Sequence, residues 1–174
     1  MLLWYFWLYS FLGFLLERAF AAATRAEHQA RRCFLLLPLC PVYGLGMLAV
    51  LALPRELPFW ALALWGGLAA TAVEYGVHWA YETLLGVRFW DYSQAPWNLR
   101  GRVCLPFTLA WAPLTAAAVR WVQPWAEALA ERVPPGVTWV CLLVFSADAL
   151  LSARFLRVTG DVEALRSLKT APGG

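Results

Sequence analysis

The stretch FWALALWGGLAATAVEYGVHWAYETLL, residues 59–85, decides how this chain can fold. At a rise of 1.5 Å per residue, one continuous helix over these residues would be roughly 40 Å long. That length exceeds the roughly 30 Å hydrocarbon core of a bilayer, so such a helix would have to tilt or protrude. The stretch therefore predicts a transmembrane helix, and its ionisable residues must face other helices rather than lipid.

The composition of the whole chain points the same way. Hydrophobic residues make up 61% of the 174 residues and charged residues only 14%, against about 45–50% and about 25% in soluble domains. The chain has eleven Trp, a residue enriched where a membrane meets water. The net charge of +3 is small and no basic run alternates with aromatic residues, so no nucleic acid is expected as a partner. We expect an integral membrane protein whose partner is the lipid bilayer.

Apolar runs long enough to span a bilayer as helices occur five times. We expect an all-α integral membrane bundle of about five transmembrane helices, at about 2–23, 34–53, 59–85, 103–123 and 137–156, within a transmembrane helical domain over 1–157. A cytosolic aromatic-polar loop is expected at 86–102 and a polar cytosolic tail at 158–174. The first run is not expected to be a cleaved signal peptide, because it lacks a basic N-terminal region and Glu17 and Arg18 interrupt its end.

The basic residues predict the orientation of this bundle. The first loop, the third loop and the tail place eleven of the fourteen Lys and Arg residues on one side, and Arg55, Arg120 and Arg132 are the three on the other. Basic residues near helix ends concentrate on the cytoplasmic side of membrane proteins. The N-terminus is therefore expected outside and the C-terminus in the cytosol (N-out/C-in), with the 86–102 loop also cytosolic.

Polar side chains within the predicted helices fall on single faces, because residues three or four apart share one side of a helix. Small residues on such a face allow helices to approach closely. We therefore expect Glu17 and Glu74 to share one cavity. The three stripes are Ser10, Gly13 and Glu17 in the first helix, Gly67, Thr71, Glu74, His78 and Glu82 in the third, and Cys141, Phe145, Asp148 and Ser152 in the fifth.

Two interpretations of the acids remain open. Arg88, Arg100 and Arg102 could neutralise Glu17, Glu74, Glu82 or Asp91 in interfacial ion pairs. Alternatively, these groups could line a cytosol-facing polar cavity, since ionisable residues inside a membrane are functional candidates. Glu74, His78 and Glu82 are only weak metal candidates, because H-E-x-x-H is absent and zinc sites usually contain more nitrogen or sulfur. No metal and no cofactor is expected.

The stretch VRFWDYSQAPWNLRGRVC, residues 87–104, is predicted to be an ordered cap over the cytosolic end of the bundle. Its aromatic residues suit the headgroup level of a membrane. Asp91 and Ser93 can bond the backbone of their own turn, and Gly101 permits a conformation that other residues resist. Arg100 and Arg102 are expected to point toward the acids of the first and third predicted helices.

The entry to the second predicted helix contains two prolines, Pro38 and Pro41. They mark either a helix start at the interface or a broken, re-entrant entry whose irregular backbone is buried in protein. The four cysteines, Cys33, Cys40, Cys104 and Cys141, form no C-x-x-C pair and are expected to be small apolar residues of the bundle.

Four stretches of the chain form a recognisable set: YSFLGFLLE at 9–17, FLLLPLCPVYGLG at 34–46, EYGVHWAYE at 74–82 and RFWDYSQAPWNLRGRVC at 88–104. Together they resemble the family named Putative ABC-transporter type IV, the CmpB-like bacterial membrane proteins. The resemblance covers about residues 5–115 and implies a multi-pass protein of the bacterial plasma (inner) membrane. Cys33 and Leu37 stand where the family has Gly, and His78 is not part of its pattern. With the family pattern added, the candidate cavity and substrate residues are Glu17, Tyr43, Glu74, Glu82, Asp91, Tyr92, Ser93, Asn98, Arg100 and Arg102.

The resemblance implies the permease subunit of an ABC-type transporter. Such a subunit would need a separate nucleotide-binding ATPase and, with about five helices, a second copy of itself. The chain has no G-x-x-x-x-G-K-[ST] loop and no G-x-S-x-G elbow, so catalysis is less favoured than transport. Two alternatives stay open: a membrane-embedded enzyme acting on a lipid or phosphorylated substrate at the cytosolic interface, and a non-catalytic scaffold.

Overall fold

The computed structural model describes residues 1–24 and 33–165, and most of these residues are helical, which confirms the all-α class. Residues 25–32 and 166–174 lie outside the described part, and with them Arg25, Arg31, Arg32 and most of the predicted tail. The elements are α1 (Leu2–Thr24), α2 (Pro41–Leu51), α3 (Phe59–Leu85), a two-residue antiparallel pair β1 (Asn98–Leu99) and β2 (Val103–Cys104), α4 (Leu105–Ala117), the π-helical turn η1 (Ala118–Val122), α5 (Gln123–Glu131) and α6 (Pro135–Thr159).

Two described helices, α1 and α6, are long and apolar enough, by length and composition, to cross a membrane. Helix α2 is apolar but has only 11 residues. At 1.5 Å per residue it is about 16 Å long, well short of a bilayer core. The prediction of one continuous helix over 34–53 is therefore wrong for residues 34–40.

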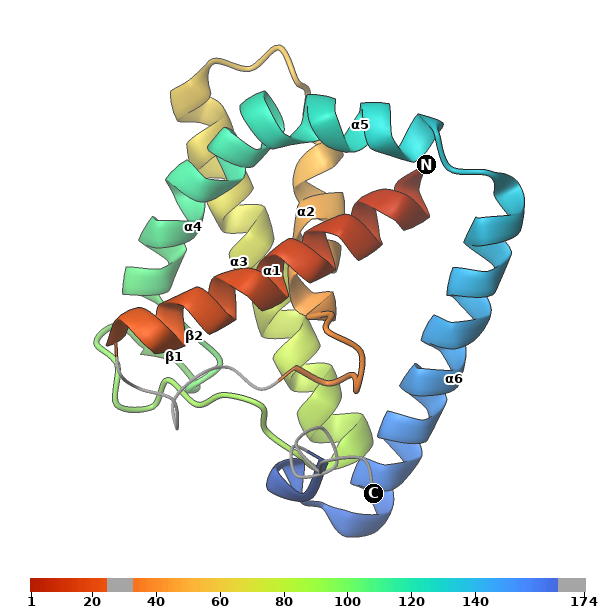
Figure 1. Cartoon of the computed structure of the whole chain (residues 1–174). Helices are drawn as coiled ribbons and strands as arrows, with labels where there is room; N and C mark the ends of the chain where they lie inside the picture. The colour runs from red at the N-terminus through yellow and green to blue at the C-terminus, as the bar shows by residue number, and fades with distance from the viewer. Residues whose placement is uncertain (25–32, 166–174) are drawn as a thin grey trace.

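Helices α1 to α4 form one packed group, in which α1 lies against α2, α2 against α3 and α3 against α4 (Figure 1). Small residues allow these close approaches. A Cβ added to Gly13 of α1 would lie 2.2 Å from Cγ of Tyr43 in α2, and one added to Gly67 of α3 would lie 3.0 Å from Cα of Ala112 in α4. Any larger side chain at either site would push the helices apart.

The fourth predicted helix, 103–123, begins two residues later and does not stop at 123. Helical structure continues through the turn η1 into α5, which crosses one end of the bundle (Figure 1). The reason lies in Pro124, which lacks an N–H and whose ring would clash with the carbonyl four residues earlier in a regular α-helix. A π-helical turn just before it relieves that conflict, so the chain continues as a helix where the sequence predicts an end.

Helix α6 stands apart from the group α1–α4 over much of its length and is attached to it at a few points (Figure 1). Trp4 Nε1 donates a hydrogen bond of 2.9 Å to Thr138 Oγ1. Near the middle, the ring of Phe145 meets that of Phe6 edge-to-face, with centroids 5.5 Å apart. The third attachment is polar and comes from Asp148.

Asp148 holds the irregular segment 33–40 in place. Its Oδ1 accepts hydrogen bonds from the Leu36 N–H at 3.0 Å and from Ser152 Oγ at 3.0 Å, and its Oδ2 accepts one from the Leu37 N–H at 2.8 Å. Asp148 is 7% exposed as a residue, and Leu35 is fully buried. Irregular backbone inside an apolar bundle needs such partners for its N–H groups, so the broken entry to α2 depends on an acid from the far end of the chain.

Replacing Asp148 with Ala is expected to lower the free energy of unfolding by about 1–3 kcal/mol, because two part-buried backbone N–H groups lose a charged acceptor. Ser152→Ala removes only one hydrogen bond to the same carboxylate and is expected to cost about 1 kcal/mol or less. Chemical unfolding in detergent measures both. Equal stability of Asp148→Ala and the parent would show that segment 33–40 does not depend on this residue.

Candidate functional site

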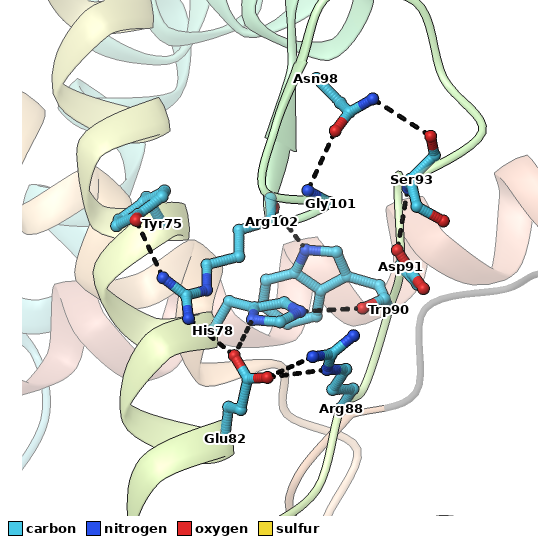
Figure 2. A network of polar contacts seen from close by, with 10 residues as sticks. All are labelled: Tyr75, His78, Glu82, Arg88, Trp90, Asp91, Ser93, Asn98, Gly101 and Arg102. Carbon is cyan, nitrogen blue, oxygen red and sulfur yellow. Dashed lines mark hydrogen bonds and ion pairs between the residues drawn. The ribbon is translucent and has the colours of Figure 1, made fainter.

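Glu82 is the centre of an ion-pair network between α3 and the loop at 86–102 (Figure 2). Arg102 donates from one guanidinium nitrogen to Glu82 Oε2 at 2.7 Å and from another to Tyr75 Oη at 2.8 Å. The same guanidinium lies over the Tyr75 ring, 5.1 Å from its centroid. Arg88 Nε donates to Glu82 Oε1 at 2.9 Å from a more exposed position. The hydrogen bond to Glu82 raises the pKa of Arg102 above its ordinary value.

Arg102 also fixes the loop through its backbone. Its carbonyl accepts a hydrogen bond of 2.9 Å from Trp90 Nε1, and the Trp90 carbonyl lies 3.0 Å from His78 Nε2 (Figure 2). His78 and Trp90 are both buried. Since a carbonyl oxygen only accepts, His78 must carry its proton on Nε2 to make this bond. The loop is thus attached to α3 by an ion pair and by a buried histidine.

Three further polar residues of the loop, Asp91, Ser93 and Asn98, bond the loop itself. Asp91 Oδ1 accepts from the Ser93 N–H at 2.8 Å, and Asn98 donates to the carbonyls of Ser93 at 3.1 Å and Ala95 at 2.9 Å. Asn98 Oδ1 accepts from the Gly101 N–H at 3.0 Å. Gly101 has φ +68°, and a Cβ there would lie 2.6 Å from Asp91 Oδ1, so a larger residue would meet both backbone strain and a clash.

Not every predicted loop residue takes part in this network. Arg100 lies exposed in the turn between β1 and β2 with φ +55°, and no hydrogen bond or ion pair joins it to an acid in the described part of the chain. The expectation that Arg100 points toward the acids is therefore wrong. Arg100 and Gly101 both have positive φ, so the chain reverses at these two residues, and Arg102 rather than Arg100 reaches Glu82.

Glu74 and Glu17 line two adjoining cavities rather than one. Glu74 is 2% exposed and lies in the wall of a cavity of about 300 Å³ between α1, α2, α3 and α4. Glu17 lines a smaller cavity of about 170 Å³ between α1, α4 and the loop, together with Tyr92. Tyr43 and Trp111 line both cavities. The single shared cavity expected from the helix stripes is thus divided by aromatic side chains.

These aromatic residues bind the two acids. Trp111 Nε1 donates to Glu74 Oε2 at 3.0 Å and Tyr92 Oη donates to Glu74 Oε1 at 3.3 Å. Tyr43 Oη donates to Glu17 Oε1. The rings of Tyr43 and Trp111 meet edge-to-face with centroids 5.5 Å apart. A continuous path of contacts therefore runs from Glu17 to Glu74.

The structure divides the candidate residues into two groups by what they can do chemically. Glu82, Asp91, Ser93, Asn98 and Arg102 hold the loop, whereas Glu17, Tyr43, Glu74 and Tyr92 face cavities. Of the weak metal candidates, His78 Nδ1 is 4.0 Å from Glu82 Oε2, while Glu74 binds Trp111 and Tyr92. No group of three side chains suited to a metal ion occurs within residues 1–24 and 33–165.

Sequence reasoning missed three residues of this arrangement. Trp111 was one aromatic among many in an apolar run, Tyr75 lies one position from the predicted stripe, and the backbone role of Trp90 has no sequence signal. Glu74 and Trp111 are 37 residues apart in the chain, so only the packing of α3 on α4 reveals the contact.

Replacing Arg102 with Ala is expected to lower the melting temperature in detergent, because Glu82 keeps only the more exposed Arg88 and Tyr75 loses its donor. Arg102→Lys should recover part of the loss, since an ammonium keeps the charge but not the planar fork that reaches two acceptors. The exposed Arg100 supplies a matched control, Arg100→Gln, which should melt like the parent. An Arg102→Ala variant as stable as the parent would contradict this role.

Comparison with known proteins assigns the chain to a family. The family model described as Putative ABC-transporter type IV matches residues 4–153, a range that includes both cavities, the loop and most of α6. No curated protein and no solved structure matches the chain significantly. The matched range extends well beyond residues 5–115, over which the sequence motifs indicate the resemblance. The chain therefore belongs to the Putative ABC-transporter type IV family.

Proposed function

We propose that this chain is the permease subunit of an ABC-type transporter in the bacterial plasma membrane, with its substrate site in the larger cavity. The observation that carries the proposal is this cavity of about 300 Å³ at the centre of α1–α4, with the buried Glu74 in its wall. Its volume is at the lower end of the range of small-molecule sites, which are mostly apolar with a few placed polar groups. An acid buried inside a membrane bundle is costly and is retained for a function.

The proposed topology is a multi-pass bundle of five crossings, N-out/C-in. The second crossing would be a bent one, built from the irregular segment 33–40 and the short helix α2. Its support is that Asp148 accepts hydrogen bonds from the amides of Leu36 and Leu37, as irregular backbone at membrane depth requires. The distribution of Lys and Arg, eleven to three, supports the orientation.

The loop at 86–102 is the proposed docking surface for the ATPase subunit. Its interior is fixed by Arg102, Trp90 and Asn98, while its tip presents Trp97, which is 82% exposed. An exposed aromatic on an ordered loop suits a protein interface, because binding then orders little additional chain. The ion pair between Glu82 and Arg102 makes the alternative, an enzyme at the cytosolic interface, less favoured. These two side chains bind each other instead of a substrate.

Topology can be tested with single cysteines in a background that lacks the four native ones. Glu56→Cys and Glu131→Cys are expected to react with a membrane-impermeant maleimide added to intact cells, because both positions are exposed and lie on the proposed outer side. Gln94→Cys, on the loop, should react only after the membrane is opened. The reverse pattern would overturn the orientation.

The docking surface can be tested by replacing Trp97 with a photoreactive phenylalanine derivative in cells. Irradiation is expected to cross-link this position to a nucleotide-binding ATPase, identified by mass spectrometry. The same derivative at Glu56, at the opposite end of α3, is the matched control and should yield no ATPase. Cross-links from Trp97 to lipid alone, with the protein at its native expression level, would contradict the transporter proposal.

A further inference from the structure

Helix α5 covers the end of the larger cavity opposite the loop at 86–102. Tyr9 of α1 and Val122, the last residue of η1, line this cavity, and Tyr9 donates a hydrogen bond of 3.0 Å to Gln123, the first residue of α5. Toward the loop, Glu74 in the cavity wall accepts a hydrogen bond from Tyr92. Figure 1 shows α5 crossing the end of the helix group at which the N-terminus lies. In the proposed topology this is the outer end, so α5 lies between the cavity and the outside.

A series of polar contacts holds α5 in this position. Gln123 accepts the hydrogen bond from Tyr9 through Oε1 and donates one of 3.0 Å from Nε2 to Glu127 Oε1. Arg55, in the connection between α2 and α3, forms an ion pair of 2.6 Å with the same Glu127 oxygen. We call the four side chains Tyr9, Gln123, Glu127 and Arg55 the latch. It joins α5 to α1 and to the connection between α2 and α3.

The two halves of the latch differ in exposure. Tyr9 is 5% exposed and Gln123 is 1% exposed, so their hydrogen bond is shielded from water. The side chains of Arg55 and Glu127 are 50% and 31% exposed, and an ion pair as exposed as this contributes little stability. The hydrogen bond from Gln123, together with the charge of Arg55, holds the pKa of Glu127 below its ordinary value. Glu127 is therefore charged at neutral pH, and water competes for the outer half of the latch.

Apolar packing adds little to the attachment of α5. The buried residues of this helix are Gln123, Ala126 and Ala130. Stabilisation by burial scales with apolar area, and the side chain of alanine is a single methyl group. The large apolar residues of the same helix, Trp125 and Leu129, are exposed. Separating α5 from α1 therefore exposes little apolar surface, and the latch supplies much of the attachment.

The chain just before α5 has the features at which helices bend. The π-helical turn η1 ends at Val122, and Pro124 follows it. Prolines and π-helical turns are common causes of kinks, and π-helical turns are frequent at functional sites. Arg120 of η1 donates a hydrogen bond to the Leu57 carbonyl, which fixes the turn to the connection between α2 and α3. The turn is thus anchored, and α5 can rotate beyond it.

We propose that α5 is the outer gate of the larger cavity, that it rotates about η1, and that the latch holds it closed. When the latch opens, α5 moves away from Tyr9 and the cavity communicates with the outer side of the membrane. The rings of Tyr43 and Trp111 still separate this cavity from the smaller one near the loop, so the two ends can open at different times. This inference rests on the proposed function, to which it adds the route between the cavity and the outside.

Access to the cavity from outside tests the gate in intact cells. Met47 lines the larger cavity and is 8% exposed, so Met47→Cys in the cysteine-free background places a thiol there. A small, membrane-impermeant methanethiosulfonate reagent is added outside, and mass spectrometry of the purified protein gives the labelling rate. Breaking the latch with Tyr9→Phe and Glu127→Gln together is expected to raise this rate about tenfold or more, because a local opening is more frequent when the hydrogen bonds that oppose it are lost.

The chain offers a matched control one helical turn away on each of the two helices. Tyr5→Phe and Glu131→Gln make the same two chemical changes outside the latch, at a buried tyrosine of α1 and an exposed acid of α5. This pair is expected to label at the rate of the parent. A folded latch variant that labels no faster than the parent, or an equal increase in the control, would overturn the gate.

A distance measurement tests the movement independently of membrane orientation, and decides the matter if the double latch variant does not fold. Nitroxide labels on Trp125→Cys of α5 and Trp60→Cys of α3, both exposed positions, report the separation of the two helices in nanodiscs by double electron–electron resonance. Salt screens the exposed pair of Arg55 and Glu127. A population at longer distance is therefore expected to grow with salt in the parent and to be insensitive to salt in Glu127→Gln. One unchanging distance in both proteins would reject the movement.

The gate and the proposed function fail in different ways. Unchanged cavity labelling in the latch variant, with Trp97 still cross-linked to an ATPase, would reject the gate alone. A gate that opens as expected, in a protein that yields no ATPase cross-link, would reject the ABC-type transporter and keep the gate.

Discussion

The structure depends on one constraint: a carboxylate inside an apolar helix bundle must find donors. Asp148 and Glu74 satisfy it with donors from distant segments of the chain, and the part-exposed Glu82 binds arginines of the loop that follows α3. Asp148 accepts hydrogen bonds from the amides of Leu36 and Leu37. Glu82 accepts them from Arg88 and Arg102, and Glu74 from Tyr92 and Trp111. Two irregular segments, 33–40 and 86–102, are thereby positioned by acids on α6 and α3.

This constraint also explains why the polar residues have unequal roles. Glu82 is neutralised by two arginines, so it holds the loop and has little capacity left for a ligand. Glu17 and Glu74 receive hydrogen bonds from tyrosine and tryptophan side chains and line cavities. The loop at 86–102 and the cavity lined by Glu74 are therefore neighbouring parts with different roles. The hydrogen bond from Tyr92 to Glu74 connects them.

The sequence predicts an element of the fold well when the interactions that form it lie within that element's own segment. Helix α3 occupies the apolar run at 59–85, and its stripe predicts that Glu74 and His78 are buried, because the periodicity of a helix is a local property. The irregular entry at 33–40 and the π-helical turn at 118–122 depend on Asp148 and on the response of a packed helix to Pro124. Pro38 and Pro41 leave the entry open between a helix start and a broken backbone, and Pro124 alone does not show whether the helix ends or continues, so packing decides both.

The candidate site likewise has features that local sequence predicts and features that only long-range packing decides. That an arginine of the loop meets an acid of α3 could be expected from charge alone, but the choice of Glu82 over Glu74, and of Arg102 over Arg100, depends on the hairpin turn of the loop. The separation of Glu17 from Glu74 depends on the rings of Tyr43 and Trp111, which no spacing rule places between them. Long-range contacts between side chains decide the site, whereas local patterns decide the helices that bear them.

Backbone hydrogen exchange of the unmodified protein in nanodiscs tests the central claim most directly, since it reports whether the acids order the two irregular segments. The account predicts that the amides of Leu36, Leu37, Tyr92 and Gly101 exchange as slowly as those of the helices α1 to α4. Exchange of these four amides at the rate of an unstructured peptide, with the helices still protected, would contradict it.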